Sequence, residues 1–229
     1  MDDGLVLVWD VDQTLSGQYF DPNVFSKNPS VNPYDYVLLN PKALQVIQLA
    51  NDAKKTGRVA IQGILTNNGD ENFIRLIITA IENKLGQKPI FDFVMTRNHP
   101  SRESTDQQPK RLQDIQTMLN EIGAPTTNLA NRVYFFDDMV HVLKYELPAN
   151  QYIQILPPFP GKDLYENPDL KGESDETNWQ SILTALRQLP PLSPSTSKGG
   201  RRMRRLAKKS RRRHKKRSRQ SRSIRDGSS

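Results

Sequence analysis

Five short apolar runs, spread over the first 156 residues, constrain the fold of this chain more than any other feature. Each is rich in Val, Ile, Phe or Tyr, and most are almost continuously apolar. Runs of this kind are typical of strands that are covered on both faces of a sheet. A glycine within the second run, Gly63, indicates either a close backbone approach or no special role. The predicted strands are residues 5–9, 58–65, 91–95, 132–136 and 152–156.

Segments with helical periodicity separate these runs, and their ends carry recognisable signals. Asn40 and Pro41 form an N-cap and first-turn pair, and glycines follow the last apolar position of three of the segments. A capping-box pattern follows the last strand. The predicted helices run from Pro41 to Gly57, from Asp70 to Gly86, from Pro109 to Gly123, and onward from the capping-box sequence at 177–180.

Strands that alternate with helices favour right-handed βαβ units. We therefore predict an α/β fold with an open, mostly parallel five-stranded sheet and helices on both faces. We expect one domain over residues 1–189, with a small flap at about 16–39 above the strand ends and a polar loop at 96–109. Residues 190–229 read as a Pro/Ser/Gly linker and a basic disordered tail.

Charge is divided unevenly along the chain. Residues 198–229, the basic tail, contain 16 Lys and Arg and one acidic residue, which leaves 17 basic and 24 acidic residues in 1–197. The tail is therefore +15 and the rest of the chain −7. Sequence-indifferent nucleic-acid binding, nuclear targeting and attachment to an anionic surface are all open roles for such a tail.

Several classes of protein are excluded or disfavoured. The chain has no cysteine, which excludes disulfides, thiolate zinc sites and a cysteine nucleophile. It has no GxxxxGK[ST] motif, which excludes a P-loop nucleotide site. No run approaches the roughly 18 apolar residues of a membrane span, so we expect a soluble intracellular protein without membrane contact. His99 and His141 are isolated in sequence, which is typical of ordinary surface or core histidines.

Polar side chains that could take part in catalysis or metal binding follow the predicted strands. Two carboxylates come directly after the first strand. They are Asp10 and Asp12 after the first strand, Thr66 after the second, Lys110 at the start of the third helix, and Asp137 and Asp138 after the fourth strand. In a parallel sheet all of them gather at the carboxyl edge, where such folds bind ligands. Four carboxylates at one edge require a cation, and oxygen-only ligands favour Mg²⁺.

These groups fit phosphoryl transfer. A carboxylate beside Mg²⁺ can attack phosphorus to form an aspartyl-phosphate. A second carboxylate two residues later can protonate the leaving oxygen and then activate water. A hydroxyl, a lysine and backbone N–H groups can stabilise the charge of the transferring group.

The ordered set "DVDQT", "LTNN", a lysine that opens a helix and "FFDD" resembles the four motifs of the haloacid dehalogenase-like (HAD) superfamily. The resemblance covers roughly residues 5–156. Most members are Mg²⁺-dependent phosphatases with an open α/β core, and the small insertions here resemble those of members that act on macromolecules.

The resemblance implies a role for each motif residue. Asp10 corresponds to the nucleophile and Asp12 to the general acid/base. Thr66 and Asn67 correspond to residues that bind the phosphoryl oxygens, and Lys110 to the residue that neutralises them and positions Asp10.

The resemblance also implies a metal site. The metal ligands that correspond to the motifs are Asp10, Asp12 (including its backbone carbonyl), Asp137 and Asp138, with Asp138 as a second ligand or an orienting residue. Gln13 stands where many relatives carry Gly or Glu, and Phe136 replaces a common Gly. Three arginines lie near Lys110 in sequence and are alternatives to it: Arg97, Arg102 and Arg111.

We therefore expect a Mg²⁺-dependent phosphomonoesterase whose substrate is a polynucleotide end or a phosphoprotein. The alternative is a catalytically vestigial HAD fold that associates with nucleic acid through the basic tail, as a structural or packaging protein. The tail also suggests a nuclear location. A basic tail on an acidic enzyme resembles proteins of large DNA viruses, so a virion is a further possible location. The oligomeric state stays open.

Overall fold

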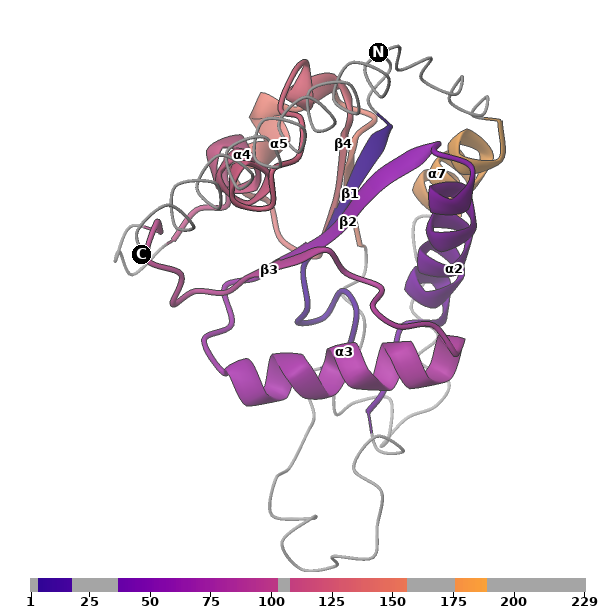
Figure 1. Ribbon diagram of the computed structural model, residues 1–229, viewed down its shortest axis with the longest axis horizontal. Coiled ribbons are helices and arrows are strands. Elements are labelled where there is room, and N and C mark those ends of the chain that lie inside the picture. The colour runs from indigo at the N-terminus through magenta and orange to yellow at the C-terminus, as the bar shows by residue number, and fades with distance from the viewer. Residues whose placement is uncertain (1–3, 18–36, 103–107, 156–175, 189–229) are drawn as a thin grey trace, which may run out of the picture. The chain divides into compact units, whose positions relative to one another are not determined.

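The five predicted strands form one parallel sheet. The structure, a computed structural model, describes residues 4–17, 37–102, 108–155 and 176–188. Within these residues the strand order is β3-β2-β1-β4-β5, and every pair is parallel (Figure 1). The predicted open parallel α/β sheet is therefore confirmed. The strands are β1 Leu5–Trp9, β2 Val59–Leu65, β3 Phe93–Met95, β4 Val133–Asp137 and β5 Tyr152–Gln154.

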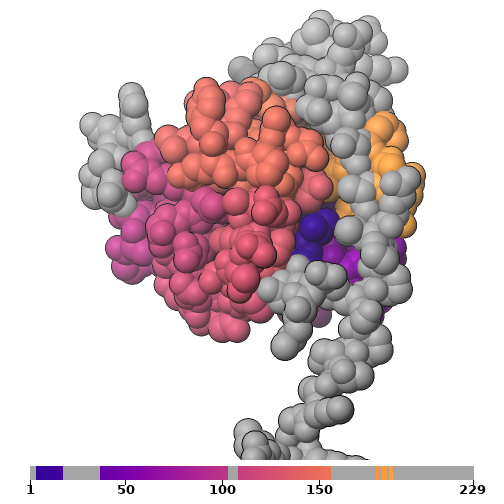
Figure 2. Space-filling model, turned by 90° about the horizontal axis from the view of Figure 1, so that it is seen from above, coloured from indigo at the N-terminus to yellow at the C-terminus, as the bar shows by residue number. Residues whose placement is uncertain are grey.

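Helices cover both faces of the sheet, as predicted. Helices α2, α3 and α7 pack on one face, and α4 and α5 pack on the other (Figure 1). The space-filling view from above shows residues 108–155 and helix α7 on either side of a small patch of the N-terminal segment (Figure 2). The helices are α2 Pro41–Lys55, α3 Glu71–Leu85, α4 Leu112–Glu121, α5 Leu143–Glu146 and α7 Glu176–Gln188, with a 3-10 turn at Leu129–Asn131.

The central strand β1 shows why the apolar runs are continuous. Successive side chains of a strand point to opposite faces. Leu7 and Trp9 belong to the core under α2, α3 and α7, whereas Val6 and Val8 belong to the core under α4. All four side chains are fully buried. At these positions β1 is therefore apolar on both of its faces.

Local end signals place helices α2 and α3. Asn40 caps α2, with its Oδ1 accepting hydrogen bonds from the N–H groups of Lys42 and Ala43. Asp70 caps α3 in the same way, and Gly86 ends that helix with a left-handed φ of 64°. These caps satisfy N–H groups that have no partner within the helix, so the sequence signals and the observed ends agree.

Helix α4 begins at Leu112, three residues later than predicted, and this is a correction. Arg111 has an extended backbone, with φ −131° and ψ 159°. The first amides are instead capped by carboxylates: Arg111 N donates to Asp114 Oδ2 at 2.9 Å, and Leu112 N donates to Glu146 Oε2 at 2.6 Å. Lys110 therefore lies in the extended segment before the helix rather than in its first turn.

Four strands and one helix start also differ from prediction: β2 starts one residue later than the predicted 58–65, and β4 lies one residue later than the predicted 132–136. The strands β3 and β5, at the two edges of the sheet, are shorter than the predicted 91–95 and 152–156, of which residue 156 lies outside the described residues. At the start of β3, the Asp92 carboxylate accepts a hydrogen bond from Gln62 N at 2.8 Å. Helix α7 spans Glu176–Gln188, so Thr177 of the predicted capping box lies within the helix.

Gly63 marks a close approach, which was one of the two interpretations of this position. A Cβ at Gly63 would lie 2.2 Å from the ring of Phe93 on the neighbouring strand. Of the predicted flap, the structure describes only the base, where Gly17 N donates to Leu38 O at 3.1 Å. Residues 18–36 and the predicted linker and tail from 190 onward lie outside the described residues. Within the described ranges, no helix has both the length and the apolar content needed to cross a membrane.

Candidate active site

Asp10 stands at the carboxyl end of the central strand, directly after β1. Its backbone N–H donates to Phe136 O at 2.9 Å, which continues the pairing with β4 for one residue. The chain then turns sharply, since Leu15 N and Ser16 N both donate to Val11 O at 3.0 Å. Gln13 adopts a left-handed φ of 56° within this turn. The turn sends Asp10 and Asp12 toward different partners.

The capping residue of α2 holds this turn in place. Asn40 Nδ2 donates to Thr14 O at 2.9 Å, and Asn40 N donates to Leu15 O at 2.9 Å. One buried asparagine therefore starts a helix and braces the loop that carries the two aspartates.

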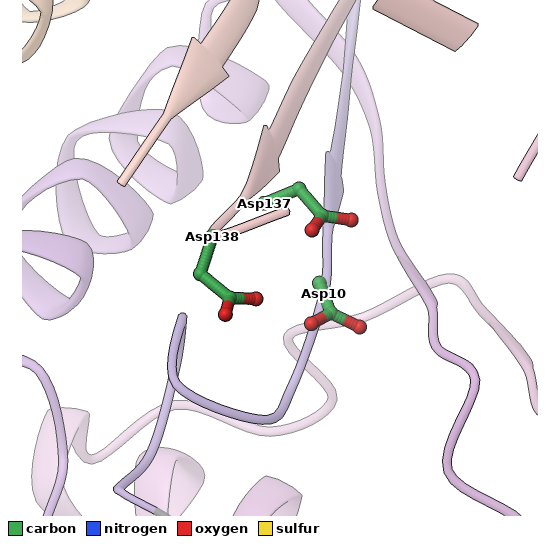
Figure 3. Close-up of side chains that lie close together, drawn as sticks. All are labelled: Asp10, Asp137 and Asp138. Atoms are coloured by element: carbon green, nitrogen blue, oxygen red, sulfur yellow. The ribbon is translucent and has the colours of Figure 1, made fainter. Parts of the chain in front are cut away.

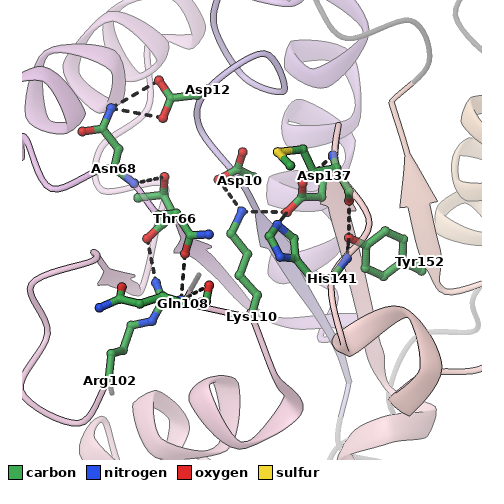
Figure 4. A network of polar contacts seen from close by, with 12 residues as sticks. Asp10, Asp12, Thr66, Asn68, Arg102, Gln108, Lys110, Asp137, His141 and Tyr152 are labelled. Atoms are coloured by element: carbon green, nitrogen blue, oxygen red, sulfur yellow. Dashed lines mark hydrogen bonds and ion pairs between the residues drawn. The ribbon is translucent and has the colours of Figure 1, made fainter. Parts of the chain in front are cut away.

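Lys110 joins the first and fourth strands through its amine. Nζ lies 2.6 Å from Asp10 Oδ1 and 2.6 Å from Asp137 Oδ2 (Figure 4). The Lys110 side chain is 2% exposed, so solvent screens these contacts poorly. Burial lowers the pKa of the Lys110 amine, but the charges of Asp10 and Asp137 outweigh this effect and raise the pKa above its ordinary value. Lys110 is therefore a buried cation between two carboxylates.

Three carboxyl groups converge at this edge of the sheet. Asp10, Asp137 and Asp138 each offer an oxygen, and these oxygens lie within 4.8 Å of one another (Figure 3). No other group of three or more potential metal ligands occurs among the residues that the structure describes. The donors are all carboxylate oxygens, the type preferred by Mg²⁺ and Ca²⁺.

The protonation behaviour of the cluster fits a cation site. Burial raises the pKa of Asp137 to about 7, even though Lys110 acts in the opposite direction. Burial, followed by the charge of Asp10, raises the pKa of Asp138 to about 6. One lysine therefore does not compensate three carboxylates, and a divalent cation would supply the missing positive charge.

The segment that follows Asp137 is held in place by its own contacts. Asp137 Oδ1 accepts a hydrogen bond from Met139 N at 2.8 Å, and Tyr152 Oη donates to Met139 O at 2.6 Å. His141 Nε2 lies 3.6 Å from Asp137 Oδ2. Burial, together with the charge of Lys110, lowers the pKa of His141 to about 4, so this imidazole is neutral at physiological pH.

Asp12 is held apart from the cluster by Asn68. Asn68 Nδ2 lies 3.2 and 3.1 Å from the two carboxylate oxygens of Asp12 (Figure 4). The Asp12 carboxylate is not part of the three-carboxylate group. Burial and then the charge of Asp10 raise its pKa above the ordinary value. A carboxyl group that keeps its proton to higher pH is suited to proton donation.

Thr66 and Asn67 begin the turn that follows β2. Thr66 is fully buried, and its Oγ1 accepts a hydrogen bond from Asn68 N at 3.1 Å. Asn67 Oδ1 accepts a hydrogen bond from Arg102 Nη2 at 2.8 Å. The Asn67 amide oxygen is thus engaged by an arginine.

The structure brings Asp10, Lys110, Asp137 and Asp138 together and places Asp12 and Thr66 in the neighbouring network. Sequence reasoning missed Asn68 as the partner of Asp12, although it lies in the same "LTNN" stretch. It also took His141 for an ordinary residue, because nothing in the sequence reports its distance from Asp137. Of the three arginines named as alternatives to Lys110, Arg102 contacts Asn67 and the Thr66 carbonyl instead.

Comparison with protein-family models finds no match, and comparison with curated proteins finds none either. Among solved structures, an uncharacterised protein from Listeria monocytogenes serotype 4b is similar at 17% identity and a TM-score of 0.37, over 80% of this chain and 98% of that one. The fission yeast RNA polymerase II CTD phosphatase Fcp1, bound to beryllium fluoride, is similar at 16% identity and a TM-score of 0.37. That alignment covers 81% of this chain and 51% of the Fcp1 chain, so this chain spans about half the length of that one.

Proposed function

We propose that this protein is a Mg²⁺-dependent phosphomonoesterase of the HAD type, which acts through an aspartyl-phosphate on Asp10. The observation that carries the proposal is the position of Lys110 Nζ, 2.6 Å from both Asp10 and Asp137, with Asp138 alongside. A buried amine between carboxylates from two strands is costly for folding alone. The free energy lost by burying this amine is explained if the site binds a dianionic phosphoryl group, which the amine would attract.

In the proposed first step the Asp10 carboxylate attacks phosphorus. Lys110 engages Oδ1, so attack falls to Oδ2. In the first step a bond forms between Asp10 Oδ2 and phosphorus, and the bond from phosphorus to the leaving oxygen breaks. Asp12 gives its proton to that leaving oxygen. Bound Mg²⁺ would supply positive charge next to the phosphoryl oxygens, held by Asp10, Asp137 and Asp138.

Water completes the cycle in the second step. Asp12, now ionised, takes a proton from the water that attacks phosphorus, and the bond between phosphorus and Asp10 Oδ2 breaks. Inorganic phosphate leaves, and both aspartates return to their starting states. Asn68 orients Asp12 in both steps because it contacts both carboxylate oxygens. Thr66, at the end of β2, would contact the phosphoryl oxygens.

The substrate proposed here is macromolecular, either a polynucleotide end or a phosphoprotein. The support is compositional: the basic tail at 198–229 has a charge of +15 and would raise the local concentration of the enzyme on an anionic polymer. The Arg-Ser repeats near its end would allow kinases to tune that charge.

The test is Asp10→Asn, assayed on an aryl phosphate with and without Mg²⁺. Turnover by the wild-type protein should require Mg²⁺, and the variant should lose at least about 10⁴-fold in kcat, as expected when a covalent nucleophile is removed. Asp52→Asn, on the exposed surface of α2, is the matched control and should keep full activity. Unchanged turnover by Asp10→Asn in a folded protein would refute the proposal. A panel of phosphopeptides and of 3′- and 5′-phosphorylated oligonucleotides then separates the substrates.

The tail composition also favours a second candidate, a nucleic-acid-associated protein with a vestigial site. In that case the full chain binds duplex DNA without Mg²⁺ and hydrolyses no phosphoester of the panel. About ten phosphate contacts would give a log-log salt slope near −9. A slope near zero would eliminate this role.

A further inference from the structure

The loop that follows β3, residues 96–102, clamps the turn that follows β2, residues 66–69. Each of the four turn residues accepts a hydrogen bond from this loop. The four bonds are Arg102 Nη1 to Thr66 O at 2.9 Å, Arg102 Nη2 to Asn67 Oδ1 at 2.8 Å, Arg97 N to Asn68 O at 3.2 Å, and Asn98 Nδ2 to Gly69 O at 2.9 Å. The conformation of the turn is therefore imposed from outside, by a neighbouring loop.

Arg102 is the charged member of this clamp, and it is 8% exposed. Its acceptors are the neutral oxygens of Thr66 and Asn67 and, at 3.4 Å, the carbonyl of Gln108 (Figure 4). Within the described parts of the chain, no carboxylate lies within 4.0 Å of its guanidinium. Burial lowers the pKa of Arg102, while Asp114 and Asp10 act on it through space in the opposite direction. A guanidinium stays protonated in proteins, so Arg102 is a buried cation that, within the described residues, contacts carbonyl oxygens rather than a carboxylate.

A buried charge without an adjacent counter-charge is expensive, and such a group calls for an explanation beyond packing. A buried guanidinium can also donate to several backbone carbonyls, as Arg132 does at the opposite end of the sheet. Arg102 differs from Arg132 in its place: it stands directly behind Thr66 and Asn67. An anion bound in front of these residues would add to the favourable charge that Asp114 and Asp10 already provide through space.

We propose that Arg102 is a positioning residue of the phosphoryl site. Its two hydrogen bonds set the Thr66–Asn67 turn, and its charge adds to that of Lys110 in attracting a dianionic phosphoryl group. The same turn carries Asn68, which orients Asp12. The two hydrogen bonds of the Arg102 guanidinium therefore also affect the position of Asp12, the proposed proton donor. This inference rests on the proposed function, because it takes the edge of the sheet to be a phosphoryl site.

The two roles of Arg102 are separated by two variants. Arg102→Lys keeps the charge and loses the planar fork, whereas Arg102→Met loses both. The full-length protein is titrated with inorganic phosphate in the presence of Mg²⁺ by calorimetry, and kcat and KM are measured on an aryl phosphate. Arg102→Met should weaken phosphate binding about tenfold. Arg102→Lys should bind phosphate within about threefold of wild type and lose about tenfold in kcat.

Arg132→Met is the matched control, because Arg132 is also buried and contacts backbone carbonyls. It should lower the melting temperature and leave phosphate affinity unchanged. If both Arg102 variants lower the melting temperature but bind phosphate within about twofold of wild type, with unchanged kcat, Arg102 is only a structural brace and the inference is wrong. Arg102→Lys keeps the test valid if Arg102→Met does not fold.

The two proposals fail in different ways. Wild-type protein that binds phosphate through Arg102 but hydrolyses no phosphoester retains the inference and rejects the proposed activity. Wild-type protein that hydrolyses the aryl phosphate, with both Arg102 variants unaffected, rejects the inference alone. Wild-type protein that neither binds phosphate nor turns over rejects both.

Discussion

The two ends of the sheet both contain a buried cation, but they satisfy it in different ways. At the amino end, Arg132 donates from Nε and Nη2 to Gly4 O at 3.1 and 3.0 Å, and from Nη1 to Thr127 O at 3.1 Å. At the carboxyl end, Lys110 lies between the carboxylates of Asp10 and Asp137, and Asp138 lies nearby. The first arrangement includes hydrogen bonds from a cation to backbone carbonyls, whereas the second places one cation beside three carboxyl groups.

This difference separates structure from function. Hydrogen bonds from Arg132 to the carbonyls of Gly4 and Thr127 tie the N-terminal segment to the loop before β4, which contributes to stability. At the other end, the raised pKa values of Asp137 and Asp138 indicate carboxyl groups that burial destabilises in their charged form. Such a cluster weakens the fold unless a ligand completes it, which is expected of a binding site.

The largest effect on stability is expected for Lys110→Met. Removal of the amine leaves two buried carboxylates without their cation, and loss of one partner from a buried pair typically costs about 3–5 kcal/mol. The loss should be larger at pH 8 than at pH 5, because Asp137, whose pKa is about 7, accepts a proton at the lower pH. Denaturant unfolding at the two pH values measures it.

The control for this variant is Lys55→Met, which removes an exposed ion pair with Asp52. Such pairs contribute less than about 1 kcal/mol, so this change should be small at both pH values. If Lys110→Met and Lys55→Met lower the unfolding free energy equally, the buried ion pairs of Lys110 contribute no more to stability than an exposed ion pair.

The next effect concerns Mg²⁺ and pH. A carboxyl group whose pKa is higher in the folded than in the unfolded protein favours folding while it is protonated. In metal-free protein this contribution is full below the ordinary pKa of 3.8, and it is lost as pH rises through about 6 for Asp138 and about 7 for Asp137. Unfolding free energy should therefore fall over this interval.

Mg²⁺ should reverse that loss. At 100 times its dissociation constant it should stabilise the protein by about 2.7 kcal/mol at pH 8, and by much less at pH 5, where protons compete for the same oxygens. Thermal unfolding with and without MgCl₂ at both pH values measures this. Asp138→Asn should reduce the response, and a wild-type protein equally insensitive to Mg²⁺ at both pH values would contradict the assigned metal site.

A smaller effect is expected at the amino end. Arg132→Met leaves the carbonyls of Gly4 and Thr127 without this donor, at a cost of about 1–3 kcal/mol. Because this end is far from the acidic cluster along the strands, the stabilisation by Mg²⁺ should match that of wild type. Chemical denaturation with and without Mg²⁺ decides this, and a lost Mg²⁺ response would mean that the two ends are coupled.

The smallest effect is expected for Gln13→Gly, in the turn between Asp10 and Asp12. Gln13 has a φ of 56°, a region that costs a residue with a side chain about 1 kcal/mol and costs glycine little. The substitution should leave stability unchanged or raise it by up to about 1 kcal/mol. A clear loss in denaturant unfolding would indicate that the Gln13 side chain makes a stabilising contact that offsets its backbone conformation.

Much of the fold could be predicted from the chain alone because its signals are local. The boundaries of β1 follow from five consecutive apolar residues, and Asn40, Asp70 and Gly86 mark helix ends through hydrogen bonds to neighbours within a few positions. Parallel pairing follows from the alternation of strands and helices. The motif aspartates directly follow predicted strands. In a parallel sheet this predicts that they gather at the carboxyl edge of the sheet.

Other features depended on contacts between segments distant in sequence. The start of α4 moved to Leu112 because Glu146, 34 residues away, caps its first amide. Asn67 and Asn68 have similar sequence signals, yet one faces Arg102 and the other Asp12. No local pattern distinguishes two adjacent asparagines in a turn, because their directions are set by what packs against them.

The sequence by itself determined the parallel α/β architecture and the kinds of group available for chemistry, since periodicity, caps and residue types act over a few positions. The tertiary structure alone decided that Lys110 contacts Asp10 and Asp137, that Asp12 is held apart by Asn68, and that Arg102 stands behind Thr66. The physical reason is that side-chain direction and burial arise from contacts across strands, where sequence separation carries no information about distance.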